Sequence, residues 1–353
     1  MIDLVGRTAA AITTLVEPHV GRPFQARQVA SWVVHREARS FSEMTDLPKA
    51  VRSDLETRFS LADPEVRRVQ HSRDGSVKYL FGLADGAAVE GVRMPDGRKL
   101  TVCLSSQAGC AVGCTFCVTG ALGAGRNLSA GEIVGQFRVM TRDLAGDIDR
   151  VNVVFMGMGE PLLNRGALGE ALDALLERVS PRRITVSTAG IVPGIRWLGE
   201  RARRPKLALS LNAPDQERRL RIMPIAARYP LEELIAAVRD FPLERGRRIT
   251  FEYVLIAGFN DAVADARMVA RLIRAIPTKV NVIPLNEDAV HFPELRRPAA
   301  RTVDLFAAAL RDAGLTVTVR WSKGLDVAAA CGQLRGLVET GETTGADGGT
   351  DAG

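Results

Sequence analysis

Between residues 100 and 319, short apolar or β-branched runs alternate with stretches of helical spacing. The runs are LTVCLS (100–105), VNVVFM (151–156), RITVS (183–187), KLALSL (206–211), ITFEYVLI (249–256) and KVNVIP (279–284). Helical stretches such as GALGEALDALLERV and DARMVARLIRAI separate them. This alternation predicts parallel strands connected by helices. About six β/α units can be counted, fewer than the eight of a closed barrel, so the expected fold class is α/β, a partial (β/α)6 barrel.

The rest of the chain divides into three shorter parts. Residues 1–72 have helical apolar spacing, as in RQVASWVVHREA, and predict a small helical N-terminal accessory domain. Residues 73–99 alternate in polarity and are broken at ADG and PDG, which predicts a short antiparallel β-meander extension. The partial barrel is expected to cover residues 100–336. Residues 337–353 are small, polar and rich in Gly and Thr, which predicts a disordered tail.

Polar residues and glycines follow five of the predicted strands. The segments are CLSSQAGC (103–110), FMGMGEP (155–161), VSTAG (186–190), LSLNAP (209–214) and IPLN (283–286). In β/α barrels the C-terminal ends of the strands carry the active site. The five segments therefore predict one shared site at the mouth of the barrel.

The composition is that of an ordinary globular protein, with 46% hydrophobic and 25% charged residues among 353. No apolar run approaches the roughly 18 residues that a membrane span needs. The N-terminus also lacks the basic start and long apolar stretch of a secretion signal. We therefore expect a cytoplasmic protein with no membrane partner. The net charge of +6 favours a polyanionic partner without identifying one.

Four of the five cysteines lie within residues 103–117, and the fifth is Cys331. In a reducing cytosol, clustered cysteines more often hold metal or do chemistry than form disulfides. Cys110, Cys114 and Cys117 have the spacing C-x3-C-x2-C, which suits a [4Fe-4S] cluster with one open iron. Zinc is the alternative, but a structural zinc needs a fourth Cys or His ligand at matching spacing, and the four histidines lie elsewhere.

A loop of this spacing at the start of a β/α barrel resembles the radical S-adenosylmethionine (SAM) superfamily, whose signature is CxxxCxxC with an aromatic residue before the last Cys. Three longer motifs narrow the resemblance to the RlmN/Cfr family of radical SAM RNA (adenine) methyltransferases, closer to its RlmN branch. They are CLSSQAGCAVGCTFCVTGALGAGRNLSAGEIVGQ, VVFMGMGEPLLN and the C-terminal AACGQL. The resemblance implies a [4Fe-4S] cluster and SAM as cofactors, with two SAM molecules per turnover.

The family methylates a ring carbon of adenine, and the resemblance implies roles for three residues. Cys331 matches the residue that first takes a methyl group from SAM, and a radical formed from a second SAM then activates this methyl for addition to the adenine. Cys103 matches the residue that attacks the sulfur, forms a Cys103–Cys331 disulfide and releases the RNA. Glu90 matches the proton acceptor proposed for the ring. Without the resemblance, buried structural cysteines and a paired surface glutamate remain as alternatives.

Seven further residues match SAM-binding positions of the family. They are Gly159, Glu160, Ser187, Ser210, Leu211, Asn212 and Asn286. A glycine permits close approach of the backbone, and the Glu160 carboxylate can meet the ammonium group of SAM. For the Ser and Asn residues, capping of strand ends and turns is the alternative.

Several positions depart from the family pattern. Asn212 stands where the family usually has His, and Ala226 stands where it has Asn. Trp321 and Lys323 lie in RWSKGLD, where Arg is commoner. Asn can donate a hydrogen bond as His does, so SAM binding is expected to survive the first change.

The resemblance implies an RNA substrate, with methylation at C2 of adenosine 2503 in 23S rRNA, and it leaves open whether adenosine 37 of tRNA is a further target or the substrate in place of the rRNA. It implies a one-electron donor such as flavodoxin or ferredoxin as a second partner, and we expect a monomer. Two alternatives stay open at this point. One is methylation at C8 of the same rRNA adenosine, as in the Cfr branch. The other is a non-catalytic iron–sulfur RNA-binding protein, which would leave Cys103 and Cys331 unexplained.

Overall fold

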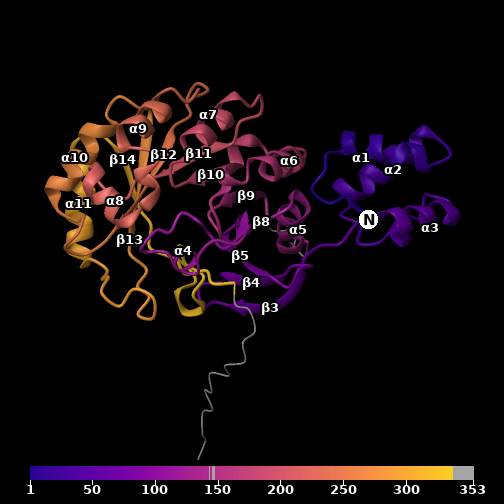
Figure 1. The fold of residues 1–353 in the computed structure, drawn as a ribbon, viewed down its shortest axis with the longest axis horizontal. Coiled ribbons are helices and arrows are strands. Elements are labelled where there is room, and N and C mark those ends of the chain that lie inside the picture. The colour runs from indigo at the N-terminus through magenta and orange to yellow at the C-terminus, as the bar shows by residue number, and fades with distance from the viewer. Residues whose placement is uncertain (143, 145–147, 337–353) are drawn as a thin grey trace, which may run out of the picture.

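A ten-stranded mixed sheet forms the centre of the molecule (Figure 1). The structure, a computed structural model, describes residues 1–142, 144 and 148–336, so the predicted disordered tail lies outside the described residues. The strand order is β14-β13-β12-β11-β10-β9-β6-β5-β4-β3. Strands β6 to β14 of this sheet pair in parallel, whereas β3, β4 and β5 pair antiparallel.

The parallel part contains the strands that the sequence predicts. They are β6 (Lys99–Cys103), β9 (Arg150–Phe155), β10 (Ile184–Thr188), β11 (Lys206–Ser210), β12 (Ile249–Leu255) and β13 (Thr278–Pro284). A seventh strand, β14 (Thr316–Val319), pairs with β13 at the edge. The connecting helices include α5 (Ala130–Thr141), α6 (Arg165–Leu175), α7 (Val192–Glu200), α8 (Gln216–Ile222), α9 (Leu231–Arg239), α10 (Val263–Ile273) and α11 (Ala300–Asp312). These strands are largely buried because helices cover the sheet, which explains their apolar runs.

The sheet curves without closing. Within the described residues, each of the strands β6 and β9 to β13 is followed by at least one helix, and β14 ends the parallel series. Edge strands β14 and β3 do not pair with each other. The predicted α/β fold with a partial six-unit barrel is therefore confirmed.

The antiparallel meander consists of β3 (Glu65–His71), β4 (Val77–Gly82) and β5 (Ala88–Asp96), and it extends the barrel sheet through β5–β6 pairing. Strand β3 lies entirely inside the range, residues 1–72, that the sequence analysis assigned to helices, so that boundary was wrong. A bulge between Val66 and Arg68 places an extra residue in this strand, so Val66 and Val69, three residues apart in the sequence, pair with Phe81 and Tyr79 and share one face. Because this spacing also fits a helix, periodicity alone could not identify the strand.

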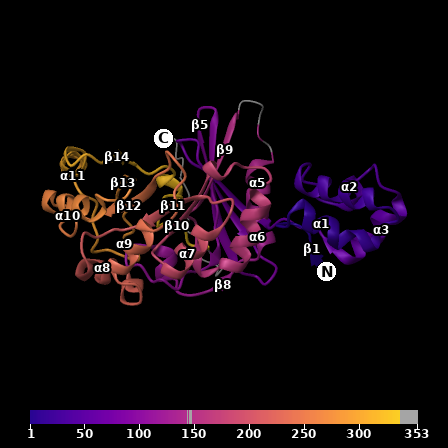
Figure 2. The same cartoon turned by 90° about the horizontal axis from the view of Figure 1, so that it is seen from above.

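The N-terminal part has a core of its own, formed by helices α1 (Ala9–Val16), α2 (Pro23–Val34) and α3 (Lys49–Arg58). The short strands β1 (Ile2–Asp3) and β2 (Phe59–Ser60) pair at its base. Figures 1 and 2 show it projecting from one side of the barrel, next to α5 and α6. Arg138 of α5, which is 2% exposed, fixes this junction through Asp63, at 3.0 Å, and the Ala38 carbonyl, at 2.8 Å.

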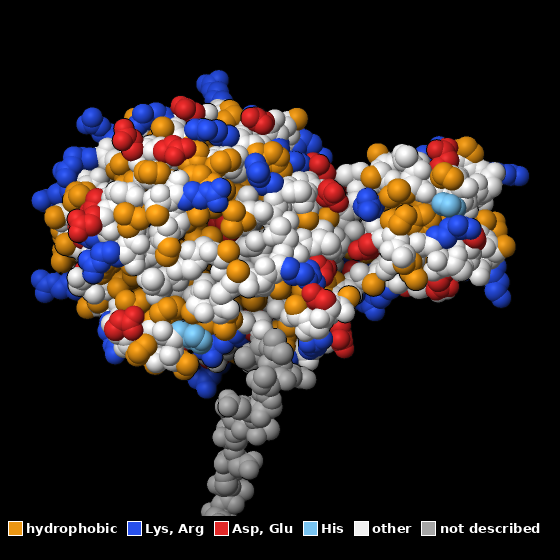
Figure 3. All heavy atoms as spheres, viewed as in Figure 1, with side chains coloured by type: hydrophobic (Ala, Val, Ile, Leu, Met, Phe, Trp, Pro, Cys, Tyr) orange, Lys and Arg blue, Asp and Glu red, His pale blue; other side chains and the backbone are white. Residues whose placement is uncertain are grey.

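Charged side chains of both signs are interspersed over the face of the molecule shown in Figure 3, with no single-sign field covering it. Among the described residues, no helix is long and apolar enough to cross a membrane.

Candidate active site

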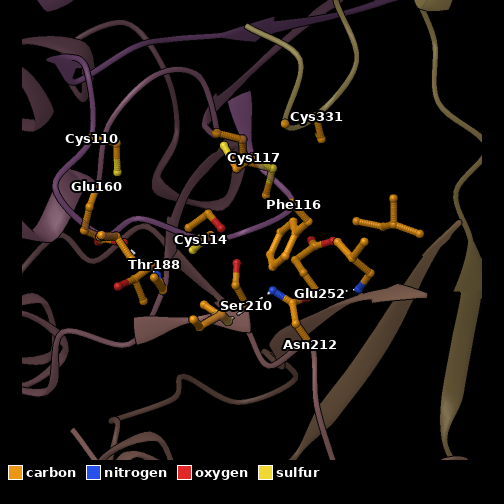
Figure 4. Close-up of a pocket in the computed structure, with 18 of the residues that line it drawn as sticks. Cys110, Cys114, Phe116, Cys117, Glu160, Thr188, Ser210, Asn212, Glu252 and Cys331 are labelled. Atoms are coloured by element: carbon orange, nitrogen blue, oxygen red, sulfur yellow. Dashed lines mark hydrogen bonds between the residues drawn. The ribbon is translucent and has the colours of Figure 1, made fainter. Parts of the chain in front are cut away.

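A cavity opens at the C-terminal ends of the barrel strands, where the sequence predicts the site. Most of the predicted site residues line it: Cys110, Cys114, Cys117, Gly159, Glu160, Ser187, Ser210, Asn212, Asn286 and Cys331. Figure 4 shows the three loop cysteines on separate sides of a shared space, with Cys331 nearby. The structure thus brings together residues that are more than 200 positions apart in the sequence.

The loop that carries the three clustered cysteines is fixed at both ends. The N–H of Cys110 donates to the Gly123 carbonyl at 2.8 Å, and the N–H of Thr115 donates to the Ile222 carbonyl at the end of α8 at 3.0 Å. Gly109 has φ +95°, and a Cβ at this position would lie 2.7 Å from the Gly123 oxygen. Only glycine therefore permits the tight path that directs the cysteines into the cavity.

The three thiols fit an iron–sulfur cluster. Burial raises the pKa of Cys110 to about 11, and it also raises the pKa values of Cys114 and Cys117. Buried thiols of this kind become thiolate ligands when a metal centre compensates their charge. In the described ranges, no three His, Cys, Asp or Glu side chains are grouped so that they could hold a single metal ion. A cluster of several irons takes its thiolates from around a shared space, as these three lie.

Glu160 is held rigidly just beyond β9. Its Oε1 accepts a hydrogen bond from the N–H of Leu162 at 3.0 Å, and its Oε2 accepts one from the N–H of Ala189 at 2.6 Å. Burial raises the pKa of Glu160 to about 7 despite these two bonds. The preceding Gly159 has φ +94° and lies against Gln107, which leaves no space for a side chain. The carboxylate is thereby placed at the cavity wall, where it can bind a cation.

Asn212 follows β11 with a left-handed backbone, φ 57°. Asn is one of the few residues that adopt this conformation readily. Its Oδ1 accepts a hydrogen bond from the N–H of Val254 at 3.0 Å, and its carbonyl accepts one from Asn260 Nδ2 at 2.7 Å. Asn212 therefore ties the ends of two neighbouring strands together at the cavity. The other departure, Ala226, is fully buried and does not line this cavity.

Three predicted residues do not line this cavity: Leu211, Glu90 and Cys103, the last of which lines the second cavity described below. The Leu211 side chain is fully buried in the main core, although its N–H donates to the Glu252 carbonyl at 2.9 Å. Glu90 is 3% exposed, lies 3.1 Å from Lys78 Nζ and accepts a hydrogen bond from the N–H of Arg335 at 2.7 Å. In this arrangement Glu90 anchors the segment that follows Cys331.

A second cavity adjoins the first. It is lined by Cys103, Val92, Met94, Arg320, Trp321, Lys323 and Cys331, among others. Cys331 lines both cavities, together with Met156 and Ile283. Burial, and to a smaller extent Cys331, raise the pKa of Cys103 to about 12, whereas Arg320 opposes the shift. The two cysteines outside the cluster loop therefore line one cavity, where Cys103 is buried and Cys331 is exposed.

The segment that carries Cys331 is held across the mouth by polar contacts. Asn286 Nδ2 donates to the Cys331 carbonyl at 3.0 Å, and the N–H of Val118 donates to the Gly332 carbonyl at 2.7 Å. On the meander side, Ser72 Oγ donates to Asp326 at 2.6 Å. Cys331 owes its place to these contacts with distant elements, not to its neighbours in sequence.

The sequence analysis missed three charged residues near the site. Glu252 of β12 lines the first cavity, and Arg320, which follows β14, lines the second. Arg219 of α8 is fully buried and donates to the carbonyls of Leu211 and Ala189. For Glu252 and Arg320, a charged residue within or next to an apolar run was the available signal, since such residues are buried only when they have a structural or chemical role. Arg219 lies in the charged segment QERRLRI and gave no such signal.

Two family models match the chain. Residues 104–270 match the Radical SAM superfamily, and residues 2–61 match the Ribosomal RNA large subunit methyltransferase N-terminal domain. The first covers the cluster loop and most of the barrel strands. The second covers the N-terminal helices. The N-terminal domain and the barrel are therefore each matched by a family model.

Curated relatives match over nearly the whole chain. The dual-specificity RNA methyltransferase RlmN of Anaeromyxobacter dehalogenans is 48% identical over 340 residues, which are 93% of this chain and 89% of the relative. The protein of the same name from Pelobacter propionicus is 43% identical over 341 residues, 96% of each chain. The crystal structure of a radical SAM methyltransferase from Sphaerobacter thermophilus is 41% identical, with a TM-score of 0.90, and covers 96% of this chain and 100% of that one. The chain therefore belongs to the RlmN family of radical SAM RNA methyltransferases, whose chemistry implies a [4Fe-4S] cluster and SAM.

Proposed function

We propose that this protein methylates C2 of an adenine in RNA, at adenosine 2503 of 23S rRNA and adenosine 37 of tRNA, by a relay through Cys331. The observation that carries the proposal is the position of Cys331, which lines both the cavity of the cluster cysteines and the cavity of Cys103. Cys331 can therefore accept a methyl group from SAM in the first cavity and pass it to the substrate in the second cavity. The names of the relatives and the matched N-terminal domain favour C2 over C8 methylation.

In this proposal the first cavity holds the cofactors. Cys110, Cys114 and Cys117 are the ligands of the [4Fe-4S] cluster, which supplies the electron that cleaves SAM. The Glu160 carboxylate binds the SAM ammonium group, since two backbone N–H groups already fix its orientation. The remaining polar side chains at the strand ends position SAM; they are Ser187, Ser210, Asn212 and Asn286.

The second cavity receives the adenine. Cys331 Sγ attacks the methyl carbon of one SAM, releasing S-adenosylhomocysteine and leaving S-methylcysteine. A second SAM would supply the radical that takes one hydrogen atom from the S-methyl group, so two are used in each turnover. The resulting methylene radical would add to the adenine carbon, and the ring would then lose its proton to Glu90, the proposed acceptor, and give back one electron. Cys103 then attacks Cys331 Sγ. The new S–S bond forms as the C–S bond breaks, and the carbon leaves on the RNA as its methyl group after gaining a proton.

The remaining parts of the proposal concern partners. A substrate base must leave its stack to reach an enclosed cavity, as in other enzymes that modify bases. The helical N-terminal domain, residues 1–72, is proposed as an accessory RNA contact, and a flavodoxin or ferredoxin as the electron donor. We propose that the enzyme acts as a monomer in the cytoplasm.

Two variants test the relay. Cys103→Ala removes the group that resolves the linked intermediate, so we expect a covalent protein–RNA adduct to accumulate under turnover conditions. Cys331→Ala removes the methyl carrier, so no adduct is expected. The measurement is denaturing electrophoresis of labelled RNA after incubation with SAM and a reductant. Equal amounts of adduct with the two variants, or none with Cys103→Ala, would contradict the assigned roles.

A further inference from the structure

Trp321 is a large apolar side chain that lies outside the protein core. It follows β14 in the segment RWSKGLD and lines the second cavity together with Cys103 and Cys331. Its exposed fraction is 53%, although tryptophans are on average highly buried. A half-exposed tryptophan thus lies at the cavity that also holds the two cysteines of the proposed relay.

The other two tryptophans of the chain have stacking partners. The guanidinium carbon of Arg36 lies over the Trp32 ring, 4.2 Å from its centroid, and that of Arg201 lies over the Trp197 ring at 5.3 Å. Among the described residues, no aromatic ring or guanidinium is stacked on Trp321. Together with its exposure, this leaves the indole of Trp321 accessible to a planar group.

Hydrogen bonds anchor the backbone on both sides of Trp321. The N–H of Arg320 donates to a carbonyl of β13 at 2.8 Å, and Lys323 Nζ donates to a carbonyl of β5 at 2.9 Å. The N–H of Gly324 donates to the Asp74 carboxylate at 2.7 Å. Because these neighbours are already fixed, a ligand that stacks on Trp321 loses little binding free energy to the ordering of this segment.

The walls of the second cavity have the chemistry of a nucleobase site. Val92 and Met94 of β5 contribute apolar surface, and Trp321 is the only aromatic ring among the described residues that line the cavity. Arg320 and Lys323 flank this ring, and none of the described lining residues is acidic. Enzymes that modify bases hold the extruded base between aromatic and apolar side chains, and cationic side chains contact the phosphates.

We infer that Trp321 is a substrate-binding residue, on whose indole ring the target adenine stacks when it enters the second cavity. The inference rests on the proposed function. Stacking would hold the adenine ring in the cavity that Cys331 lines, where the methyl group is to be transferred. Arg is commoner in this segment of the family, and its planar guanidinium also stacks on bases. This chain therefore replaces one planar partner with a larger one.

The test uses a 23S rRNA fragment that carries 2-aminopurine, a fluorescent analogue of adenine, in place of adenosine 2503. Its amino group occupies the carbon that would be methylated, so the bound probe does not react. 2-Aminopurine fluoresces when it leaves the stack of the RNA and is quenched when it stacks on an aromatic ring. Fluorescence and the Kd for RNA are measured with anaerobically reconstituted protein, with SAM and without reductant.

Four proteins are compared: wild type, Trp321→Leu, Trp321→Phe and Leu325→Ala. Leu325 is a matched control, since it is a 43% exposed apolar residue of the same segment and lines neither cavity. Base–aromatic stacking strengthens binding by about fivefold or more per base, so Trp321→Leu should raise the Kd by at least about that factor. It should also make the bound probe brighter. Trp321→Phe should recover most of the quenching and affinity, which a misfolded segment would not allow, and Leu325→Ala should resemble wild type.

Equal probe fluorescence and equal Kd for wild type and Trp321→Leu would overturn the inference. So would a Trp321-dependent change in fluorescence that occurs only when 2-aminopurine replaces a neighbouring nucleotide, because the target adenine would then not be the stacked base. The wild-type protein is assayed in parallel for 2-methyladenosine on the unmodified fragment. A lack of methylation there would contradict the proposed function, whereas methylation combined with unchanged binding by Trp321→Leu would contradict this inference alone.

Discussion

At the scale of single residues, burial sets the chemistry of Glu160. Its carboxylate is fixed by two N–H donors, yet its pKa is raised to about 7 because it is removed from water. A carboxyl group with a raised pKa is protonated at acidic pH and ionised only above that value. The proposed contact with the SAM ammonium group therefore depends on pH in the physiological range.

We expect the affinity for SAM to rise between pH 6 and pH 8. Below pH 7 the protonated Glu160 loses its charge-assisted contact, which is worth about 1.5–3 kcal/mol, or roughly a tenfold or larger change in affinity. Equilibrium dialysis with labelled SAM measures this, and Glu160→Gln is the control. The variant should bind weakly at every pH. A wild-type affinity that stays constant over the range would contradict this role.

Residue spacing predicted only part of the site. Cys110, Cys114 and Cys117 could be grouped because their ligand pattern is local, and the structure places them at one cavity. Glu252 could not be recognised in the same way. Its position in the apolar run ITFEYVLI shows that it is unusual, but not which residues surround it. Its contact with Asn281 depends on strand pairing between distant segments, and its place beside the other cavity residues depends on the fold of the whole barrel.

At the scale of elements, the short loops after the strands determine the shape of the site. The loop after β9 depends on Gly159, whose φ is +94° and whose hypothetical Cβ would lie 2.5 Å from Gln107 Cβ. Gly258 has a similar φ of +69°, but no atom lies within 4 Å of the corresponding position. Substitution of each glycine by Ala therefore separates two costs: backbone strain, which both positions share, and steric overlap, which arises only at Gly159.

Gly258→Ala should cost about 1 kcal/mol of unfolding free energy, because Ala is strained at positive φ. Gly159→Ala carries the same strain together with the overlap with Gln107, for which overpacking adds about 1–3 kcal/mol. Denaturant unfolding of the two variants measures the difference. Gly159→Ala should also weaken SAM binding, since the loop carries Glu160. Equal stability of the two variants would show that the loop can move away from Gln107.

Helices and strands were predicted correctly where the spacing of apolar residues fitted only one of the two. The parallel strands were found because their apolar runs are bounded by turns and helices. Strand β3 was missed because Val66 and Val69 have a helical spacing in the sequence, and only the bulge lets residues three apart share one face of a strand. Leu211 shows a related limit of sequence analysis. Its place at the end of a strand was predicted correctly, but the sequence did not show where its side chain lies. Its backbone N–H bonds to the Glu252 carbonyl, and its side chain packs in the main core.

At the scale of the whole molecule, topology brings the relay cysteines together. Cys103 ends β6 in the middle of the sheet, and Cys331 lies in the segment that follows the edge strand β14. That segment reaches back across the mouth and is held by Asn286 and by the meander. No local pattern contains this information, so the pairing of the two cysteines came from the family resemblance. The structure adds that Cys331 separates two adjoining cavities.

The central claim is that this protein adds a methyl group to C2 of adenine in RNA through Cys331. The most direct measurement is mass spectrometry of nucleosides from the 23S rRNA and tRNA of cells with and without the protein. We predict that 2-methyladenosine disappears in its absence and returns with the wild-type gene but not with Cys331→Ala. Unchanged 2-methyladenosine, or loss of 8-methyladenosine in its place, would contradict the claim.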